Sequence, residues 1–333
     1  MNPIHVAAVI PALNVGSAIG GVLREMPALI TTIVVVDDGS TDDTAAVIEQ
    51  CARQDRRIHL IRHASNGGVG AAMVTGFRTA LQLEAAIIVK IDGDGQMPLW
   101  LLPKLIAPLI SGEADYVKGN RFRDVQALHK MPALRRFGNV ALSFLAKAAT
   151  GYWHCFDPTN GFVAIRADVL SQLPLHRIDT TYFFEISMLI HLYLLGAVVK
   201  EQPMPPRYAG EPSSLSIPRV LIGFPGRLLR AFVRRIVFKN FVYDFTIGSL
   251  HIAAGVPLLI AGMVYGGYNW YWYTSHRLAA PTGTVVLSAL LIILGFQLLL
   301  SAISFDLQAV PRIPINEGSL AEVPSRLEGN DRR

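Results

Sequence analysis

Two aspartates separated by a single residue, Asp92 and Asp94, are the side chains whose type and spacing point most directly to chemistry. They follow an apolar, strand-like run, and alternate residues of an extended turn project to the same side. Carboxylate oxygens placed in this way suit Mg²⁺ or Mn²⁺, which also binds a diphosphate group. Gln96 adds an amide oxygen two residues further on. We therefore predict a Mg²⁺ or Mn²⁺ site at Asp92, Asp94 and Gln96.

A second acidic pair, Asp37 and Asp38, ends another strand-like run. An acid at this position can accept hydrogen bonds from a nucleotide base or ribose, as in dinucleotide-binding sheets. The alternative role is to cap the following helix, for which Ser40 or Thr41 is well suited. Residues 66–70 form a glycine-rich turn ahead of a helix and resemble a phosphate-binding turn. They lack the Lys-Ser/Thr pair of a P-loop, which excludes a P-loop ATPase.

The elements that must position these residues alternate along the first two-thirds of the chain. Apolar, often β-branched runs predict strands at residues 5–11, 32–36, 58–62, 86–91, 116–118 and 162–165. Amphipathic patterns predict helices at residues 17–26, 42–53, 70–83 and 99–110. This alternation is typical of an α/β fold with a mostly parallel sheet and helices on both faces. Ligands of such sheets bind beyond the carboxyl ends of the strands, where the acidic residues lie.

The last third of the chain has the composition of membrane-spanning helices. The whole chain is 51% hydrophobic and only 17% charged, and residues 245–276 and 278–305 contain no Asp, Glu, Lys or Arg. Each of these stretches exceeds the ~20 residues that a helix needs to cross a bilayer. We predict two transmembrane helices, at residues 246–268 and 284–305, with a cluster of interfacial aromatic residues between them at 268–273.

The net charge of +5 is concentrated in one segment, residues 217–245, which holds six Lys or Arg side chains and one Asp. A neutral body with a single basic segment argues against a nucleic-acid partner. Basic residues interleaved with large apolar ones predict amphipathic helices in the plane of the lipid headgroups. Because Lys and Arg favour the cytoplasmic side of a membrane, we expect both termini to be cytoplasmic.

Four early motifs occur in order: Val-Ile-Pro-Ala-Leu-Asn at 9–14, Val-Asp-Asp-Gly-Ser-Thr-Asp at 36–42, Asn-Gly-Gly-Val-Gly at 66–70 and Asp-Gly-Asp-Gly-Gln at 92–96. Together they resemble the motifs of the family 2 glycosyltransferases of the GT-A fold. Later motifs, at 118–122, 157–162, 184–185, 207–214 and 234–245, are similar in order to the polyprenyl-phosphate sugar synthases. These include the dolichyl-phosphate mannose and bactoprenyl-phosphate glucose synthases, and the resemblance covers nearly the whole chain.

The resemblance implies a binding site for each of two substrates. The nucleotide sugar would contact Pro11, Asn14, Asp37, Asp38, Asn66, Gly67 and Asp92. The acceptor phosphate would contact Arg121, with Arg135 or Arg136, and Arg207 and Ser213. The catalytic residues would be Asp92, Asp94, Arg121 and Asp157. Asp157 would orient the sugar or the acceptor, and capping of the turn before Pro158 is its alternative role.

The implied activity is transfer of a hexose from a UDP- or GDP-sugar to a polyprenyl phosphate, with inversion at the anomeric carbon. The implied location is the cytoplasmic face of a bacterial plasma membrane, in a homo-oligomer such as a tetramer. We expect a catalytic domain at 1–215, basic amphipathic helices at 216–244, two transmembrane helices at 245–306 and a polar cytoplasmic tail at 307–333.

Two other functions stay open at the level of sequence. A processive membrane polysaccharide synthase usually carries a Gln-x-x-Arg-Trp motif and more membrane spans, and the sequence has neither. A non-catalytic membrane scaffold with a degenerate transferase fold would not need the intact pair Asp92 and Asp94, or Arg121.

Overall fold

The computed structural model describes residues 4–121, 143–205 and 217–316 of the 333-residue chain. These residues form two compact units. The first unit contains the described residues up to Ala231 and those from Pro311 onward, and the second is Phe232–Val310. Four predicted site residues, Arg135, Arg136, Arg207 and Ser213, lie outside the described residues.

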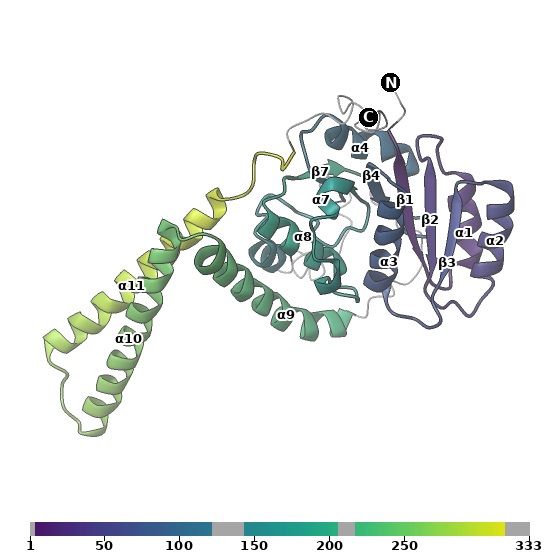
Figure 1. The fold of residues 1–333 in the computed structure, drawn as a ribbon. Coiled ribbons are helices and arrows are strands. Elements are labelled where there is room, and N and C mark those ends of the chain that lie inside the picture. The colour runs from purple at the N-terminus through teal and green to yellow at the C-terminus, as the bar shows by residue number, and fades with distance from the viewer. Residues whose placement is uncertain (1–3, 122–142, 206–216, 317–333) are drawn as a thin grey trace, which may run out of the picture. The chain divides into compact units, whose positions relative to one another are not determined.

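A single seven-stranded sheet organises the described part of the first unit, in the order β3-β2-β1-β4-β6-β5-β7 (Figure 1). The strands are β1 Val6–Ala12, β2 Thr32–Asp37, β3 Ile58–Arg62, β4 Ile87–Lys90, β5 Tyr116–Asn120, β6 Val163–Arg166 and β7 Val199–Pro203. Only β6 runs antiparallel to its neighbours, β4 and β5. The predicted mostly parallel α/β sheet is confirmed. The reversal of β6 brings its first residues to the edge where β4 and β5 end.

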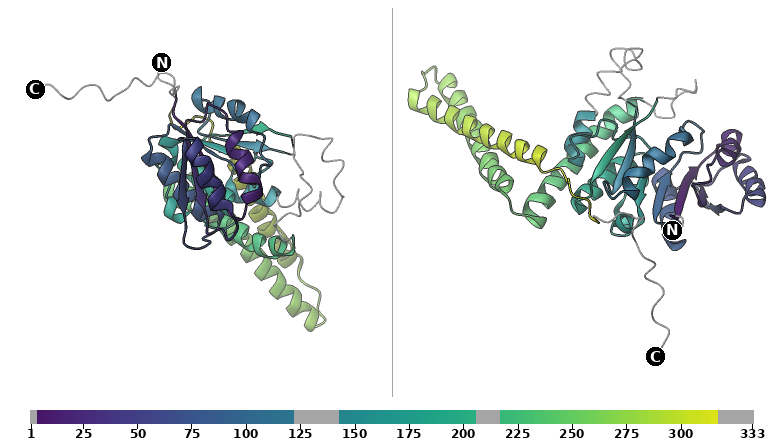
Figure 2. Two further views of the ribbon diagram at one scale, coloured as in Figure 1. Left: turned by 90° about the vertical axis from the view of Figure 1, so that its right-hand side faces the viewer. Right: turned by 90° about the horizontal axis from the view of Figure 1, so that it is seen from above.

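Helices cover both faces of this sheet, as Figure 2 shows from two further sides. The helices are α1 Gly16–Arg24, α2 Thr44–Gln54, α3 Val69–Gln82, α4 Leu102–Ile110, α7 Ala167–Leu170 and α8 Phe184–Leu195, with short 3₁₀ turns at Leu99–Leu101 and Leu175–Arg177. Residues of α1, α2 and α4 form one core with Ala8 and Ile10 of β1. On the other face, α3 packs so closely that a Cβ on its Gly76 would lie 2.2 Å from a methyl carbon of Val9. Burial on both faces explains why the central strands are apolar apart from Thr32 and Asp37 of β2 and Lys90 of β4.

Two long apolar helices dominate the second unit, α10 Ile247–Ser275 and α11 Thr282–Gln308. Both are long and apolar enough to cross a membrane, and they pack side by side (Figures 1 and 2). Glycines allow the close approach: a Cβ on Gly295 would lie 2.5 Å from the backbone nitrogen of Leu259. The aromatic cluster predicted between two spans lies instead within the last turns of α10, because the helix continues to Ser275.

The basic segment forms one long helix, α9 Ile217–Val237, followed by a π-helical stretch at Phe238–Tyr243. Towards its end, Leu229 and Val233 are exposed, as are the neighbouring Arg230 and Arg234. Exposed apolar and basic side chains on the same helix are typical of helices that lie in a membrane interface.

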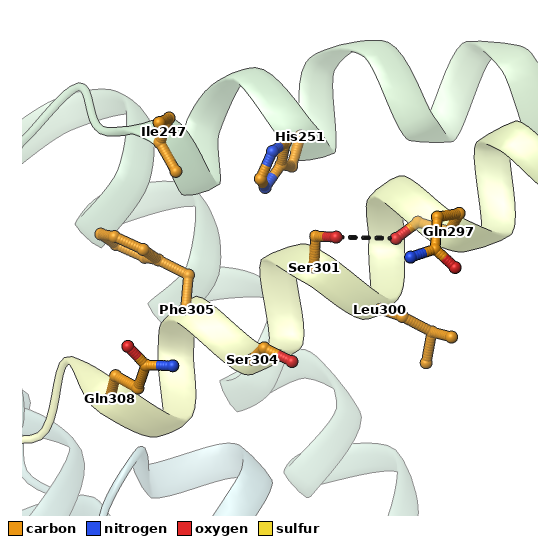
Figure 3. A pocket seen from close by; sticks show the side chains of 8 residues that line it. All are labelled: Ile247, His251, Gln297, Leu300, Ser301, Ser304, Phe305 and Gln308. Atoms are coloured by element: carbon orange, nitrogen blue, oxygen red, sulfur yellow. Dashed lines mark hydrogen bonds between the residues drawn. The ribbon is translucent and has the colours of Figure 1, made fainter.

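A groove of about 270 Å³ lies between α10 and α11 (Figure 3). It is lined by Ile247, His251, Gln297, Leu300, Ser301, Ser304, Phe305 and Gln308. Within it, the Ser301 hydroxyl donates a hydrogen bond to the Gln297 carbonyl oxygen at 3.0 Å. None of the predicted site residues that the structure describes lines this groove. The candidate active site is considered at the edge of the sheet, where Asp37, Asp92 and Asp94 lie.

Candidate active site

The loops that follow β1 and β2 are joined by Asn14. Its φ of +52° places it in the left-handed region, which asparagine tolerates better than most residues. Its side-chain oxygen accepts a hydrogen bond from the Thr41 backbone nitrogen at 2.9 Å. Its own backbone nitrogen donates to the Ser40 hydroxyl at 3.0 Å. Asn14 therefore shapes the rim at which it was predicted to meet the nucleotide.

Asp38 holds the glycine-rich turn in place. Its carboxylate is buried and accepts hydrogen bonds from the backbone nitrogens of Gly67 and Gly68, at 3.0 and 2.8 Å. His63 approaches the same carboxylate at 2.7 Å through Nδ1. The Asp38 side chain thus connects the end of β2 with the glycine-rich turn, and both segments are predicted to contact the nucleotide. The predicted contact of Asp38 with the nucleotide stays a prediction.

Asp37 is also buried, but its two oxygens differ. Oδ1 accepts a hydrogen bond from the Ser40 backbone nitrogen at 2.9 Å, which supports the turn after β2. Oδ2 lies 3.4 Å from the guanidinium of Arg62 and has no hydrogen-bond partner among the described residues. The pair Asp37 and Asp38 therefore builds the two loops around the predicted nucleotide site.

Asp92 and Asp94 lie directly beyond β4, at the same edge of the sheet. Asp94 is exposed, and its Oδ1 accepts a hydrogen bond from the Gln96 backbone nitrogen at 3.0 Å, which forms a tight turn. Gly95 takes a φ of +75° in this turn. Gln96 and Asp92 are both partly exposed. The turn presents an accessible set of oxygen donors of the kind that Mg²⁺ and Mn²⁺ prefer.

The donor set fits a cation that the substrate helps to bind. Within the described ranges, no group of three or more His, Cys, Asp or Glu side chains is arranged to hold a metal ion. Asp92, Asp94 and the amide of Gln96 would therefore supply part of a coordination shell. Mg²⁺ typically takes one or two carboxylates plus substrate phosphates and water, so the residues present fit such an ion.

Sequence reasoning missed Lys90, which lies beneath Asp92, and grouped its second partner, Glu185, only with the later motifs. Lys90, on β4, is 2% exposed, and its ammonium lies 2.6 Å from Oδ1 of Asp92 and 3.3 Å from Oε1 of Glu185 on α8. Burial by itself lowers the pKa of Lys90, but the charges and hydrogen bonds of the two carboxylates outweigh it and raise that pKa above its ordinary value. Lys90 is therefore a fixed cation under the acidic turn.

A second charged pair, Arg121 and Asp157, lies two strands away along the same edge. The guanidinium donates two hydrogen bonds to the Asp157 carboxylate, from Nε at 2.8 Å and from an Nη at 3.0 Å. Asp157 is fully buried, whereas the Arg121 side chain is 42% exposed. Adjacent strands lie ~4.8 Å apart. Because only β6 separates β4 from β5, the strand that precedes Arg121 lies about 10 Å from the strand that precedes Asp92.

The surroundings of Asp157 keep it ionised. Burial raises its pKa, but the hydrogen bonds and positive charge of Arg121, together with the charge of Lys118, lower it by more. Asn160 donates a further hydrogen bond to Oδ2 at 3.1 Å. Glu201 accepts from the backbone nitrogen of Asp157 at 3.2 Å. Asp157 therefore orients Arg121. Its predicted role in orienting the sugar or the acceptor, and the alternative of capping the turn before Pro158, stay predictions.

Exposed apolar side chains adjoin this pair. Phe156 precedes Asp157 and is exposed, as are Phe144 and Leu145 among the helical residues 143–150. The ammonium of Lys147 lies 3.3 Å from the centre of the Phe156 ring. A guanidinium for an anion and an apolar surface thus lie next to each other.

These features can be compared with known proteins. The model of the family described as glycosyl transferase family 2 matches residues 7–173, half of the chain, which includes both acidic motifs and Arg121. The chain belongs to glycosyltransferase family 2. The family predicted from the ordered motifs is therefore confirmed, and so is the prediction that the chain is a glycosyltransferase.

Two curated relatives of this glycosyltransferase act on lipid phosphates, according to their names. The UDP-N-acetylglucosamine–dolichyl-phosphate N-acetylglucosaminyltransferase of Methanococcus voltae is 30% identical over 178 residues, which cover 50% of this chain and 70% of the relative. The undecaprenyl-phosphate mannosyltransferase of Micrococcus luteus is 30% identical over 173 residues, which cover 52% and 70%.

A solved structure supports the fold of this glycosyltransferase. Glucosyl-3-phosphoglycerate synthase of Mycobacterium tuberculosis, in complex with Mn²⁺, UDP-glucose and phosphoglyceric acid, has a TM-score of 0.51 and 22% identity. The match covers 70% of this chain and 79% of that chain. The GT-A fold predicted from the sequence is confirmed.

Proposed function

We propose that this glycosyltransferase transfers a hexose from a nucleotide-diphosphate sugar to a polyprenyl phosphate at the surface of a membrane. The observation that carries the proposal is the pairing, on one sheet edge, of the acidic turn at Asp92 and Asp94 with the Arg121–Asp157 pair. The first suits a diphosphate and its cation, and the second suits a separate phosphate. The names of the two lipid-phosphate relatives support the same acceptor class.

The acceptor side of the site follows from charge. A phosphomonoester has a second pKa of ~6, so the lipid phosphate is already an anion at neutral pH and can attack without a strong general base. Arg121 would bind it through two hydrogen bonds, since a guanidinium matches phosphate geometry. Asp157 fixes the plane of that guanidinium. The adjoining Phe144 and Phe156 would contact the first isoprene units.

The donor side must release a nucleoside diphosphate. Asp92, Asp94 and Gln96 would hold Mg²⁺ or Mn²⁺, which would neutralise the charge of the leaving diphosphate. Asn14 and the turn held by Asp38 would enclose the nucleotide. In a single in-line displacement, the bond from the anomeric carbon to the diphosphate oxygen breaks and a bond to the lipid-phosphate oxygen forms. Such a displacement inverts the anomeric centre.

The membrane location rests on the second unit and on α9. The lengths and compositions of α10 and α11 suit two spans, and the basic side chains of α9 would bind anionic headgroups. A catalytic unit held at the interface would meet an acceptor whose phosphate lies in the same plane. Because Lys and Arg favour the cytoplasmic side of a membrane, the basic residues before α10 support a cytoplasmic location of this unit.

Product analysis tests this function. Purified protein in detergent is incubated with undecaprenyl phosphate and, in separate reactions, UDP-glucose, UDP-N-acetylglucosamine and GDP-mannose. The proposal expects one organic-soluble lipid-phosphate sugar, formed only with added Mg²⁺ or Mn²⁺, with the anomeric configuration opposite to that of the donor. A water-soluble glycoside, a lengthening polysaccharide or a product that retains the donor configuration would contradict it.

A further inference from the structure

The interior of the sheet beneath the acidic turn contains a lysine with two acidic partners. The side chain of Lys90 is 2% exposed and lies on a strand whose other residues are apolar. Burying an ammonium is costly unless it is paired. Here the Lys90 ammonium pairs with two carboxylates, that of Asp92 at 2.6 Å and that of Glu185 at 3.3 Å.

The two carboxylates that pair with Lys90 differ in their location and burial. Glu185 is mostly buried, in the first turn of α8, and faces the interior. Asp92 is 36% exposed and belongs to the turn at the sheet edge. Lys90 binds Oδ1 of Asp92, and Oδ2 has no hydrogen-bond partner among the described residues. The lysine therefore fixes one oxygen of Asp92 and leaves the other for a ligand.

The lack of a side chain at Gly161 leaves room for these three charged groups. A Cβ at this position would lie 2.3 Å from Nζ of Lys90, 3.0 Å from Oδ2 of Asp92 and 3.5 Å from Oε1 of Glu185. All three charged groups therefore converge on the backbone that leads into β6. Any side chain here would displace the ammonium or the carboxylate that it holds.

We propose that Lys90, anchored by Glu185, is a positioning residue that fixes the carboxylate of Asp92 for the cation and diphosphate of the donor. This role rests on the proposed function, because it concerns the donor side of the same site. Partners that orient metal ligands from behind commonly contribute 10- to 100-fold to metal affinity. Glu185 acts through Lys90 and has no contact of its own with the donor in this proposal.

A purely structural role for Lys90 makes a different prediction. If the lysine only neutralises a buried Glu185, removing both charges together should restore every property. If it positions Asp92, removing both charges should restore folding but leave Asp92 without its support. Stability and metal affinity therefore separate the two roles.

The test compares Lys90→Met with the double variant Lys90→Met/Glu185→Gln in the full-length protein. Binding of Mn²⁺ is followed by electron paramagnetic resonance with UDP and, separately, with GDP, and thermal unfolding is measured in parallel. We expect Lys90→Met to bind Mn²⁺ about 10- to 100-fold more weakly than the wild type and to unfold at a lower temperature. The double variant should regain most of the unfolding temperature and keep the weak Mn²⁺ binding.

A matched control removes another charged pair, between the buried Arg166 of β6 and the partly exposed Asp168 of α7. Arg166 and Asp168 are ion-paired at 2.8 Å, and Arg166 pairs with Ile87 at the opposite end of β4. Arg166→Met/Asp168→Asn should lower the unfolding temperature without changing Mn²⁺ affinity. Gly161→Ala keeps every charge but adds the methyl group beside Nζ, and should weaken Mn²⁺ binding as Lys90→Met does.

Several results would overturn the role of Lys90. These are wild-type Mn²⁺ affinity in Lys90→Met, wild-type affinity in the double variant, or an equal loss in the Arg166 control. Should Lys90→Met not fold, the double variant and Gly161→Ala decide the matter by the same criterion. A wild type that binds no Mn²⁺ with either nucleotide would refute the proposed function as well, which distinguishes the two failures.

Discussion

At the scale of single residues, the bidentate pair of Arg121 and Asp157 sets the strongest constraint on the acceptor. Arg121→Lys keeps the charge but cannot keep both hydrogen bonds to the carboxylate. We expect the KM for polyprenyl phosphate to rise by at least ~10-fold, the value of one charge-assisted hydrogen bond, while the affinity for the nucleotide sugar stays close to that of the wild type. Separate titrations of the two substrates measure this, and an equal loss for both would remove Arg121 from the acceptor site.

The exposed carboxylate of Asp94 gives the matching prediction for the donor. On the proposed function, Asp94→Ala would remove a charged oxygen ligand from a site that has few protein ligands among the described residues. We expect turnover to fall by more than ~100-fold, since even the partners of metal ligands contribute 10- to 100-fold. The exposed Glu49 on α2 provides the control, because Glu49→Ala removes an equal charge outside the site. Near-wild-type turnover in Asp94→Ala would mean that this carboxylate holds no cation.

The lowered pKa of Asp157 predicts a pH dependence of stability. An unfolded Asp titrates near 3.9, so the folded protein gains stability from this group above that pH and loses it as the pH falls through the lower, folded value. Asp157→Asn should cost about 1.5–3 kcal/mol at pH 7 and less below pH ~4. Denaturant unfolding at pH 7, 5 and 3.5 measures the difference, and a cost independent of pH would contradict it.

The sequence was enough to predict site residues that lie close together in local motifs. It was not enough to predict the side chains from distant parts of the chain that contact them. Asp92, Asp94 and Gln96 lie in one turn, so their spacing was enough to group them. The contact between Lys90 and Glu185 joins residues 95 positions apart on different elements. Nothing in the local pattern around Lys90 indicates that a charged side chain on a buried strand has such a partner.

At the scale of elements, the glycine-rich turn depends on the loop before α8. Gly68 has a φ of +94°, and a Cβ there would lie 2.4 Å from the carbonyl oxygen of Thr180. The same Thr180 carbonyl oxygen accepts a hydrogen bond from the Gly70 backbone nitrogen at 2.9 Å. The adjoining Thr181 accepts a hydrogen bond from Arg227 of α9 at 3.2 Å. The turn predicted to meet the nucleotide is thus connected to the basic helix.

Gly68→Ala tests this arrangement. We expect a loss of about 1–3 kcal/mol in the free energy of unfolding, because alanine disfavours positive φ, and weaker binding of UDP or GDP. Gly21→Ala on α1 is the matched control, since a Cβ there meets nothing within 4 Å, and should stabilise the protein by ~0.5–1 kcal/mol. Equal effects of the two substitutions on unfolding and nucleotide binding would show that the turn is not constrained as described.

The strands and helices with clear periodicity were predicted to within three residues of their observed ends, whereas no bounds were predicted for α7, α8 and β7. α8 is buried almost all around, so its sequence has no polar face to give a helical period. β7 lies at the edge of the sheet and contains Lys200, Glu201 and Gln202, which conceal the apolar pattern of a strand. The direction of β6 was also beyond local sequence, because long-range pairing decides it.

At the scale of the whole molecule, the two apolar helices and the basic segment predict a membrane topology. Single cysteines introduced at residues near 272 and near 314 should react differently with a membrane-impermeant reagent added to intact cells. We expect labelling only at the first position, since the connection between α10 and α11 should lie outside and the flanks inside. Labelling of both positions, or only of the second, would contradict this orientation.

The central claim is that a lipid phosphate is the acceptor of the sugar, and nucleotide release measures it most directly. Purified wild-type protein and Asp94→Ala are mixed with the nucleotide sugar that gives product, with and without undecaprenyl phosphate. We predict rapid release of the nucleoside diphosphate by the wild type only when the lipid phosphate is present, and its loss in Asp94→Ala and in EDTA. Release at the same rate without the lipid phosphate would contradict the account.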